Sequence, residues 1–214
     1  MNPLLMILSL GVIIFSAILH EIAHGLVADR LGDPTARLRG RLTLNPVPHI
    51  DLWMSIVIPL LLILGGSPII IGGAKPVPVD PFNLRDGKKD LAIVSLAGPV
   101  TNFLIAGLSA LLAHILFPEA SLFALMNTNF LGLLLGLFIN YNLMLGIFNL
   151  IPIPPLDGSK ILAMFLPPDL ERSYLSLSAF GFFIIFFLLM PFSPIPLGSI
   201  ISNMIKFCLS LLGF

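Results

Sequence analysis

The sequence predicts an all-α polytopic membrane protein, with about five transmembrane helices, a re-entrant hairpin and a short interfacial β segment. Of the 214 residues, 57% are hydrophobic and 10% are charged, whereas an average soluble protein is about 25% charged. The mean hydropathy is +1.04, and no soluble core could hide so much apolar surface. We interpret the whole chain, 1–214, as one domain with a core at 4–166 and a C-terminal transmembrane hairpin at 174–213.

Five stretches are apolar over close to the roughly 20 residues that a helix needs to cross a bilayer. They lie at 4–29, 91–117, 129–150, 174–191 and 195–213. The first stretch has neither the basic start nor the small-residue cleavage site of a signal peptide, so we expect it to remain as the first membrane helix.

A sixth apolar stretch, 52–74, is broken by prolines and glycines. Basic residues gather in the connections 30–51 and 75–90, and Lys160 and Arg172 lie in the connection between the apolar stretches 129–150 and 174–191. The positive-inside rule places all three connections in the cytoplasm. A full span at 52–74 would put the first two on opposite sides. We therefore expect a re-entrant hairpin that turns at 65–68, with the N-terminus outside and the C-terminus inside.

The connection after the first helix contains a regular pattern. Residues 36–44 alternate between apolar and polar side chains, which predicts a strand or hairpin at the membrane surface. Pro46 and Pro48 then end it. An exposed strand edge pairs with an extended peptide by β-augmentation, so we expect Leu42 and Leu44 to contact a substrate.

The motif His20-Glu21-Ile22-Ala23-His24 lies inside the first apolar stretch. On a helix, residues four apart share a face, so His20 and His24 can bind one metal ion, and Glu21 can act on a water molecule beside it. With this composition, a chance HExxH is expected roughly 0.001 times in the chain. The alternative is a pair of core histidines that bond across helices, and it leaves Glu21 in lipid without an explanation.

Two histidines do not complete a catalytic zinc site, which usually has three protein ligands and an open position. Asp157 is the best candidate for the third ligand, because it is the first charged residue after the uncharged run 120–156. Three prolines at 152–155 break the helix and leave Asp157 on an irregular stretch. An Asp-Gly turn or a helix N-cap before 159–166 explains Asp157 equally well, so the residues alone leave its role open.

Three segments in this order resemble the site-2 protease family of intramembrane zinc metalloproteases. They are the HExxH helix, 97–102 (AGPVTN) and 149–158 (NLIPIPPLDG). The resemblance runs from about residue 12 to 166, and HExxH combined with a proline-rich LDG segment is specific. Residues 40–46, 49–51 and 74–79 are similar to the compact bacterial and archaeal branch of the family, which has no PDZ domain.

The resemblance implies one zinc ion per chain, bound by His20, His24 and Asp157. It also implies that Glu21 is the general acid and base. Asn149 matches a family asparagine that helps to hold the substrate or to stabilise the oxyanion.

Weaker expectations follow from the same resemblance. Asn102 and Lys75 are expected to contact the substrate. The chain departs from the family at 159–160, which reads Ser-Lys where relatives often have Gly-Arg, and after Asp51, where relatives often have a proline. Neither departure changes a proposed metal ligand, so they bear on local loop shape and substrate preference.

Other polar residues have less specific roles. His49 and Asp51 would form a second metal site or orient the first, but a structural role in a loop at the interface is favoured. His114 is expected at the membrane interface. Asn140 and Asn142 are expected to bond between helices rather than to catalyse.

The implied function is hydrolysis of peptide bonds in transmembrane proteins or membrane-adjacent peptides, in the cell membrane, with the active site toward the cytoplasmic side. A metal transporter with the same ligands is one alternative, and it predicts metal flux and tolerance of Glu21→Gln. A proteolytically inactive homologue that binds membrane proteins is the other. The net charge of zero gives no reason to expect nucleic acid, a homo-oligomer is compatible with the sequence, and Cys208 alone excludes an internal disulfide.

Overall fold

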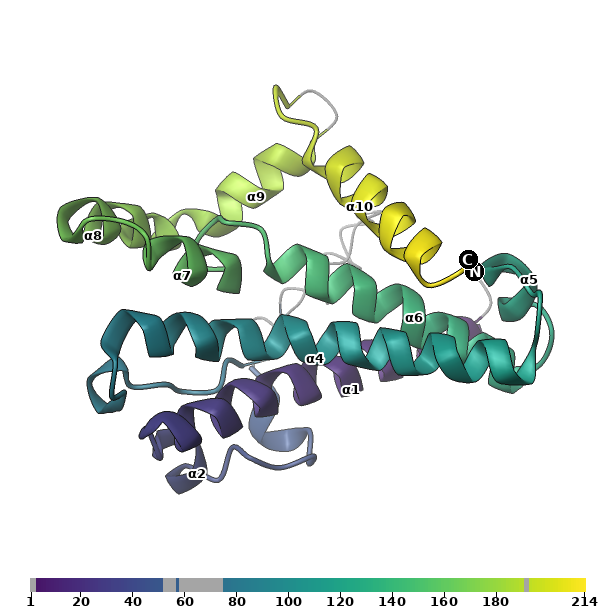
Figure 1. The fold of residues 1–214 in the computed structure, drawn as a ribbon, viewed down its shortest axis with the longest axis horizontal. Coiled ribbons are helices and arrows are strands. Elements are labelled where there is room, and N and C mark those ends of the chain that lie inside the picture. The colour runs from purple at the N-terminus through teal and green to yellow at the C-terminus, as the bar shows by residue number, and fades with distance from the viewer. Residues whose placement is uncertain (1–2, 52–56, 58–74, 191–192) are drawn as a thin grey trace.

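The computed structural model describes residues 3–51, 57, 75–190 and 193–214. Its regular elements are all helical (Figure 1), so the predicted all-α fold class is confirmed for this part of the chain. Three long helices form the body of the molecule: α1 (Pro3–Leu31), α4 (Gly87–Leu116) and α6 (Phe130–Asn149). Helix α4 packs along both α1 and α6, and α1 also contacts α6.

The three long helices confirm the first three predicted spans. Their apolar stretches of 28, 30 and 20 residues are each long enough to cross a membrane. Helix α1 ends where Gly32 adopts a φ of 114° and Asp33 donates a hydrogen bond to the Ala28 carbonyl (2.9 Å), which is the Schellman arrangement. Helix α6 begins where the Asn129 side chain accepts a hydrogen bond from the Gly132 N–H (2.9 Å), as an N-cap does.

Small side chains form one side of the contact between α4 and α6. Three alanines of α4 are buried against apolar residues of α6: Ala106, Ala110 and Ala113 against Leu135, Ile139 and Leu143. In a bilayer the lipid is as apolar as the side chains, so helices associate through close packing, which small residues permit. This contact fixes α6 beside α4 and thereby places the chain that follows α6.

The predicted span at 174–191 is part of a bent pair of helices. Helices α8 (Pro168–Ser176) and α9 (Gly181–Leu189) flank a short 3₁₀ turn, and the bend between the two halves is 73°. An ideal Cβ on Gly181 would lie 1.8 Å from the Pro154 carbonyl oxygen. The bend therefore lies where the chain packs closely against the proline-rich segment.

The number of membrane spans is lower than the sequence predicted. Helix α10 (Leu197–Leu211), at the predicted span 195–213, has 15 residues, fewer than the roughly 20 that a bilayer needs. The described helices give three spans, or four if the bent pair counts as one, so the prediction of five is not supported. The predicted re-entrant hairpin at 52–74 lies outside the described residues, apart from residue 57.

The predicted β segment is wrong. Its first residues form the short helix α2 (Thr35–Leu38), and the residues up to Pro46 turn without pairing as a strand. Gly40, two residues after the end of α2, adopts a φ of 63°, and the Arg41 N–H donates to the Ala36 carbonyl (2.9 Å) in a second Schellman arrangement. Local helix-end chemistry therefore overrides the alternation of apolar and polar residues.

The connections on either side of residues 52–74 pack on each other. The carboxylate of Asp33 is fully buried, and it accepts hydrogen bonds from the Asp80 N–H (2.7 Å) and from the side chain of Asn83 (3.0 Å). Asn83 closes the 3₁₀ turn η3 (Pro81–Asn83). The two connections thus lie at one end of the bundle, as the charge pattern predicted.

The third basic connection lies at the same end. Lys88, in the first turn of α4, forms an ion pair with Glu171 of α8. Helix α5 (Leu122–Met126), which joins α4 to α6, lies at the opposite end of the bundle (Figure 1). All three basic connections therefore gather at one end of the molecule.

Candidate metal centre

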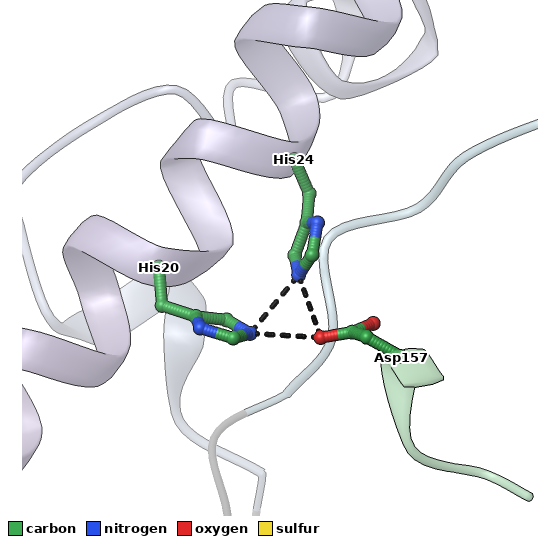
Figure 2. A group of neighbouring side chains, drawn as sticks. All are labelled: His20, His24 and Asp157. Carbon is green, nitrogen blue, oxygen red and sulfur yellow. Dashed lines mark hydrogen bonds and ion pairs between the residues drawn. The ribbon is translucent and has the colours of Figure 1, made fainter. Parts of the chain in front are cut away.

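Side chains from two distant parts of the chain meet at one point. His20 and His24 come from α1 and Asp157 from the first residue of α7 (Asp157–Ala163), and Figure 2 shows the three side chains pointing toward one another. Each histidine Nε2 lies close to Asp157 Oδ2, at 3.1 Å for His20 and 3.2 Å for His24, and the two Nε2 atoms are 3.0 Å apart. All three residues are buried, and in the described part of the chain they form the one group suited to hold a metal ion.

The far nitrogen of each imidazole makes a hydrogen bond that sets its tautomer. His24 Nδ1 donates to the Val94 carbonyl (2.7 Å), which can only accept, and His20 Nδ1 donates to Asn102 Oδ1 (2.6 Å). With the proton on Nδ1, each Nε2 carries a lone pair. Two lone pairs and a carboxylate oxygen thus face one another, an arrangement that a shared cation stabilises.

The donor set fits zinc. Ligand atoms of a tetrahedral zinc ion at about 2.0–2.1 Å lie roughly 3.3 Å from one another, close to the 3.0–3.2 Å observed. The Lys160 ammonium lies 3.4 Å from Asp157 Oδ1, and its positive charge favours the ionised form of this carboxylate. The carboxylate is therefore ionised, as a metal ligand must be.

Gly98 of α4 lets this helix approach the histidines. An ideal Cβ at Gly98 would lie 2.5 Å from the Nε2 atoms of both His20 and His24. Pro99 follows inside the helix and has no N–H to continue the hydrogen-bond ladder. Gly98 therefore permits α4 to pack against the two histidines, a role that the sequence analysis did not assign.

A chain of hydrogen bonds runs from His20 through the three long helices. Asn102 of α4 accepts from His20 and donates through Nδ2 to Asn142 Oδ1 of α6 (2.8 Å). Asn142 in turn donates to Ser16 Oγ of α1 (2.9 Å). All members are buried, with Ser16, Asn102 and Asn142 fully so. The prediction that Asn142 bonds between helices is confirmed, whereas Ser16 was missed although it lies one helical turn before His20.

The proline-rich segment between α6 and α7 positions Asp157 next to the histidines. Helix α6 ends at Asn149, and turns and bends follow before α7 begins at Asp157. An ideal Cβ on Gly158 would lie 2.2 Å from the Leu150 carbonyl oxygen, so Gly158 permits a close approach to the end of α6. The Asp-Gly pair thus starts a helix and also supplies the candidate third ligand.

Glu21 makes a hydrogen bond to the connection that follows residue 74. Its Oε2 accepts from the Val77 N–H (2.7 Å), which lies in segment 75–80, a segment without regular secondary structure. Val77 is itself buried against Gly25, where an ideal Cβ would approach the valine side chain to 3.0 Å. Segment 75–80 is therefore fixed beside the HExxH helix by this hydrogen bond and by the packing of Val77.

The other predicted substrate-binding residues are on α6 and in the polar connections. Asn149 donates through Nδ2 to the Leu145 carbonyl of its own helix (3.0 Å). Leu44 and Lys75 are exposed, and Leu42 is half-buried. Their proposed contacts with substrate stay predictions.

Two histidines outside the centre make structural contacts. His49 ends the 3₁₀ turn η1 (Val47–His49) and bonds through Nε2 to the Thr43 carbonyl (3.0 Å), which supports its favoured role in a loop. His114 bonds to the Leu212 carbonyl (2.6 Å) and stacks on Phe214. It joins the end of α4 to the C-terminal residues.

Comparison with known proteins identifies the family. The sequence model of Peptidase family M50 matches residues 6–191. The Bacillus subtilis (strain 168) protein named "Putative zinc metalloprotease YwhC" is 35% identical over 188 residues, which are 87% of this chain and 80% of that protein. "Putative zinc metalloprotease Rip2" of Mycolicibacterium smegmatis is 33% identical over 176 residues, which are 82% of this chain and 64% of that protein.

No solved structure matches the chain. The family match nevertheless covers most of its length, and it includes both the HExxH helix and the segment that carries Asp157. The chain therefore belongs to peptidase family M50, the site-2 protease family, and is an intramembrane zinc metalloprotease.

Proposed function

We propose that this chain hydrolyses peptide bonds of membrane-embedded proteins at the centre formed by His20, His24 and Asp157, with Glu21 as the general base. The observation that carries the proposal is the convergence of three possible metal ligands, His20 Nε2, His24 Nε2 and Asp157 Oδ2, within 3.2 Å of one another. The Glu21 carboxylate is on the same helix as the two histidines. When bound, zinc supplies Lewis acidity, which polarises the scissile carbonyl and acidifies water.

Glu21 moves the proton in this proposal. The Val77 N–H holds Oε2 and so fixes the orientation of the carboxylate. Oε1 then takes a proton from the attacking water and delivers it to the leaving amine nitrogen, which becomes a neutral amine as the C–N bond breaks. The water oxygen ends in the new carboxyl group, which releases the second water proton to the solvent, so the products are two shorter chains.

Several residues are proposed to handle the substrate. Asn149 lies at the end of α6, where its amide would donate to the developing oxyanion after leaving the Leu145 carbonyl. Leu42, Leu44 and Lys75 would contact the substrate chain from the polar loops. Asn102 is fully buried against His20, and this placement favours an effect on the substrate through His20 rather than by direct contact.

The active site is proposed to open toward the cytoplasm, in the cell membrane. Support comes from the three basic connections at one end of the bundle, which the positive-inside rule places in the cytoplasm. His20 lies 11 residues before the end of α1 at that side, or about 16 Å at 1.5 Å per residue. That depth is below the membrane surface but nearer to the basic end than to the start of α1.

Zinc content and cleavage test the proposal together. We expect about one zinc ion per chain in the detergent-purified wild type, a large loss in Asp157→Ala, and retention in Glu21→Gln. Cleavage of a transmembrane reporter should be abolished in both variants. Glu171→Gln removes an acidic residue from α8, outside the metal centre, and serves as the control that keeps both zinc and activity.

Other outcomes would indicate a different ligand set or a different function. Full zinc retention in Asp157→Ala would place the third ligand elsewhere. Zinc flux into vesicles that survives Glu21→Gln would favour a transporter, and reporter turnover that survives Glu21→Gln would favour an inactive binding protein. The family relationship argues against both alternatives.

A further inference from the structure

A cavity with charged residues in its lining lies apart from His20, His24 and Asp157. It has a volume of about 630 Å³ and lies between the turns after α2 and the segment that begins at residue 75. Its lining is of two kinds. The charged residues are Arg39, Arg41, Lys75 and Asp51, and prolines, Pro76 and Pro78 among them, form the apolar part.

The charge of the lining favours an anion. Three cationic side chains face the cavity against one carboxylate, which leaves an excess of two positive charges. Like charges gathered beside a low-dielectric wall raise the local concentration of counter-ions. An anionic ligand would relieve this excess.

Arg41 supplies an independent observation. The residue is 8% exposed, and its Nη2 donates to the carbonyls of Lys75 (2.6 Å) and Pro76 (3.3 Å). These bonds fix the guanidinium in place, yet its buried Nε has no hydrogen-bond partner among the residues that the structure describes. A buried donor without a partner is costly, and a guanidinium matches an oxyanion such as phosphate.

The apolar part of the lining narrows the class of ligand. The prolines give the cationic cavity an apolar rim, and the chain spans a membrane. A lipid, which carries a phosphate and an apolar part, can contact both the cationic side chains and the prolines, whereas a free phosphate ion would contact only the cationic side chains. We propose that the cavity binds the phosphate headgroup of an anionic membrane lipid through Arg41, Arg39 and Lys75.

The site has a structural link to the metal centre. Segment 75–78 forms one wall of the cavity, and its Val77 N–H holds Glu21. A lipid bound to Arg41 and Lys75 would therefore steady the segment that orients this carboxylate. This consequence rests on the proposed role of Glu21, whereas the binding itself does not.

Lipid titration of the purified full-length protein in a neutral detergent tests the proposal. The probes are phosphatidylglycerol, zwitterionic phosphatidylcholine and inorganic phosphate, with bound lipid counted by native mass spectrometry. Arg41→Lys keeps the charge but removes Nε, and the double variant Arg39→Gln with Lys75→Gln removes two exposed charges. The control is Arg172→Gln with Lys206→Gln, which removes two exposed charges from α8 and α10.

We expect phosphatidylglycerol to bind more tightly than phosphatidylcholine. Its affinity should fall about tenfold or more in both cavity variants, because charge-assisted hydrogen bonds are lost, and should be unchanged in the control. Thermal unfolding and zinc content check that each variant is folded. Because no activity is measured, failure of the protease proposal would leave this result intact.

Three results would overturn the lipid site. They are equal affinity for both lipids, an equal loss of phosphatidylglycerol affinity in the cavity variants and the control, or an unchanged phosphatidylglycerol affinity in the cavity variants. Displacement of phosphatidylglycerol by millimolar inorganic phosphate would support the phosphate site and assign it to the free ion instead.

Discussion

Residues with no metal-binding chemistry hold the metal ligands in place. His20, His24 and Asp157 could be found from helix spacing and from the resemblance to a family. Gly98 could not, because its contact with both histidines depends on how α4 docks against α1. Ser16 gave a weak signal, since it lies four residues before His20 and residues so spaced share a helix face.

Replacement of Gly98 by alanine should damage the metal centre. The new Cβ would lie 2.5 Å from both Nε2 atoms, so the imidazoles must move from their positions or α4 must shift. We expect zinc affinity to fall by about tenfold or more, measured by competition with a chromophoric chelator. Gly107→Ala on the same helix is the control, because no atom lies within 4 Å of its Cβ position. Equal zinc affinity in both variants would contradict the docking of α4.

Asn142 should act on zinc without touching it. Leucine at this position removes the acceptor that orients Asn102, which in turn orients His20. Changes in such outer partners typically weaken metal binding by about 10–100-fold, so we expect Asn142→Leu to lie in that range. Asn140→Leu, on the same helix, should bind zinc as the wild type does. If both variants bind zinc equally, the hydrogen-bond chain does not position His20.

Helix ends decide the structure of the polar connections. The sequence predicted the long helices well because an uninterrupted apolar run has few alternatives in a membrane. It failed at 35–44 because alternation of apolar and polar residues is a weak signal over so short a stretch. Gly32 and Gly40, which follow α1 and α2, adopt positive φ values. Glycines at these positions are a sequence signal for helix ends and turns rather than for a strand.

Asp33 should stabilise the fold in a pH-dependent manner. Burial raises its pKa, but hydrogen bonds from Thr35, Asn83 and Asp80 lower it more, so the folded value lies below the ordinary one. The stabilisation is therefore complete above the unfolded pKa of about 3.9 and is lost as the pH falls through the folded pKa. At pH 7 we expect Asp33→Asn to cost about 1.5–3 kcal/mol, and the cost should shrink toward pH 3.

Unfolding measured from pH 3 to pH 7 in detergent checks this expectation. Asp29→Asn is the matched control, because Asp29 pairs with an exposed Arg37 side chain, and such surface pairs contribute about 0–1 kcal/mol. A cost of Asp33→Asn that stays constant with pH would mean that its ionised form is not what holds the two connections together.

For the topology of the chain, the charges of the connections were a better guide than the number of apolar stretches. Charge asymmetry predicted that the connections before and after 52–74 share one side, and the contacts of Asp33 with Asp80 and Asn83 place them together. The count of five spans failed because hydropathy does not register a 73° bend or a helix of 15 residues. Mean apolarity therefore locates membrane segments better than it decides whether they cross.

Single cysteines should report which end of the bundle faces the cytoplasm. In a Cys208→Ser background, Asp86→Cys and Arg172→Cys lie at the basic end, and Glu119→Cys lies in the connection near α5; all three positions are exposed. In intact cells a membrane-impermeant maleimide should label Glu119→Cys alone, since the positive-inside rule places the other two in the cytoplasm. After the cells are opened, all three should react. If only one of Asp86→Cys and Arg172→Cys were labelled in intact cells, the two connections would lie on opposite sides of the membrane, which would contradict their shared end of the bundle. If both were labelled in intact cells, the orientation would be the reverse of the proposed one, and the metal centre would open to the outside.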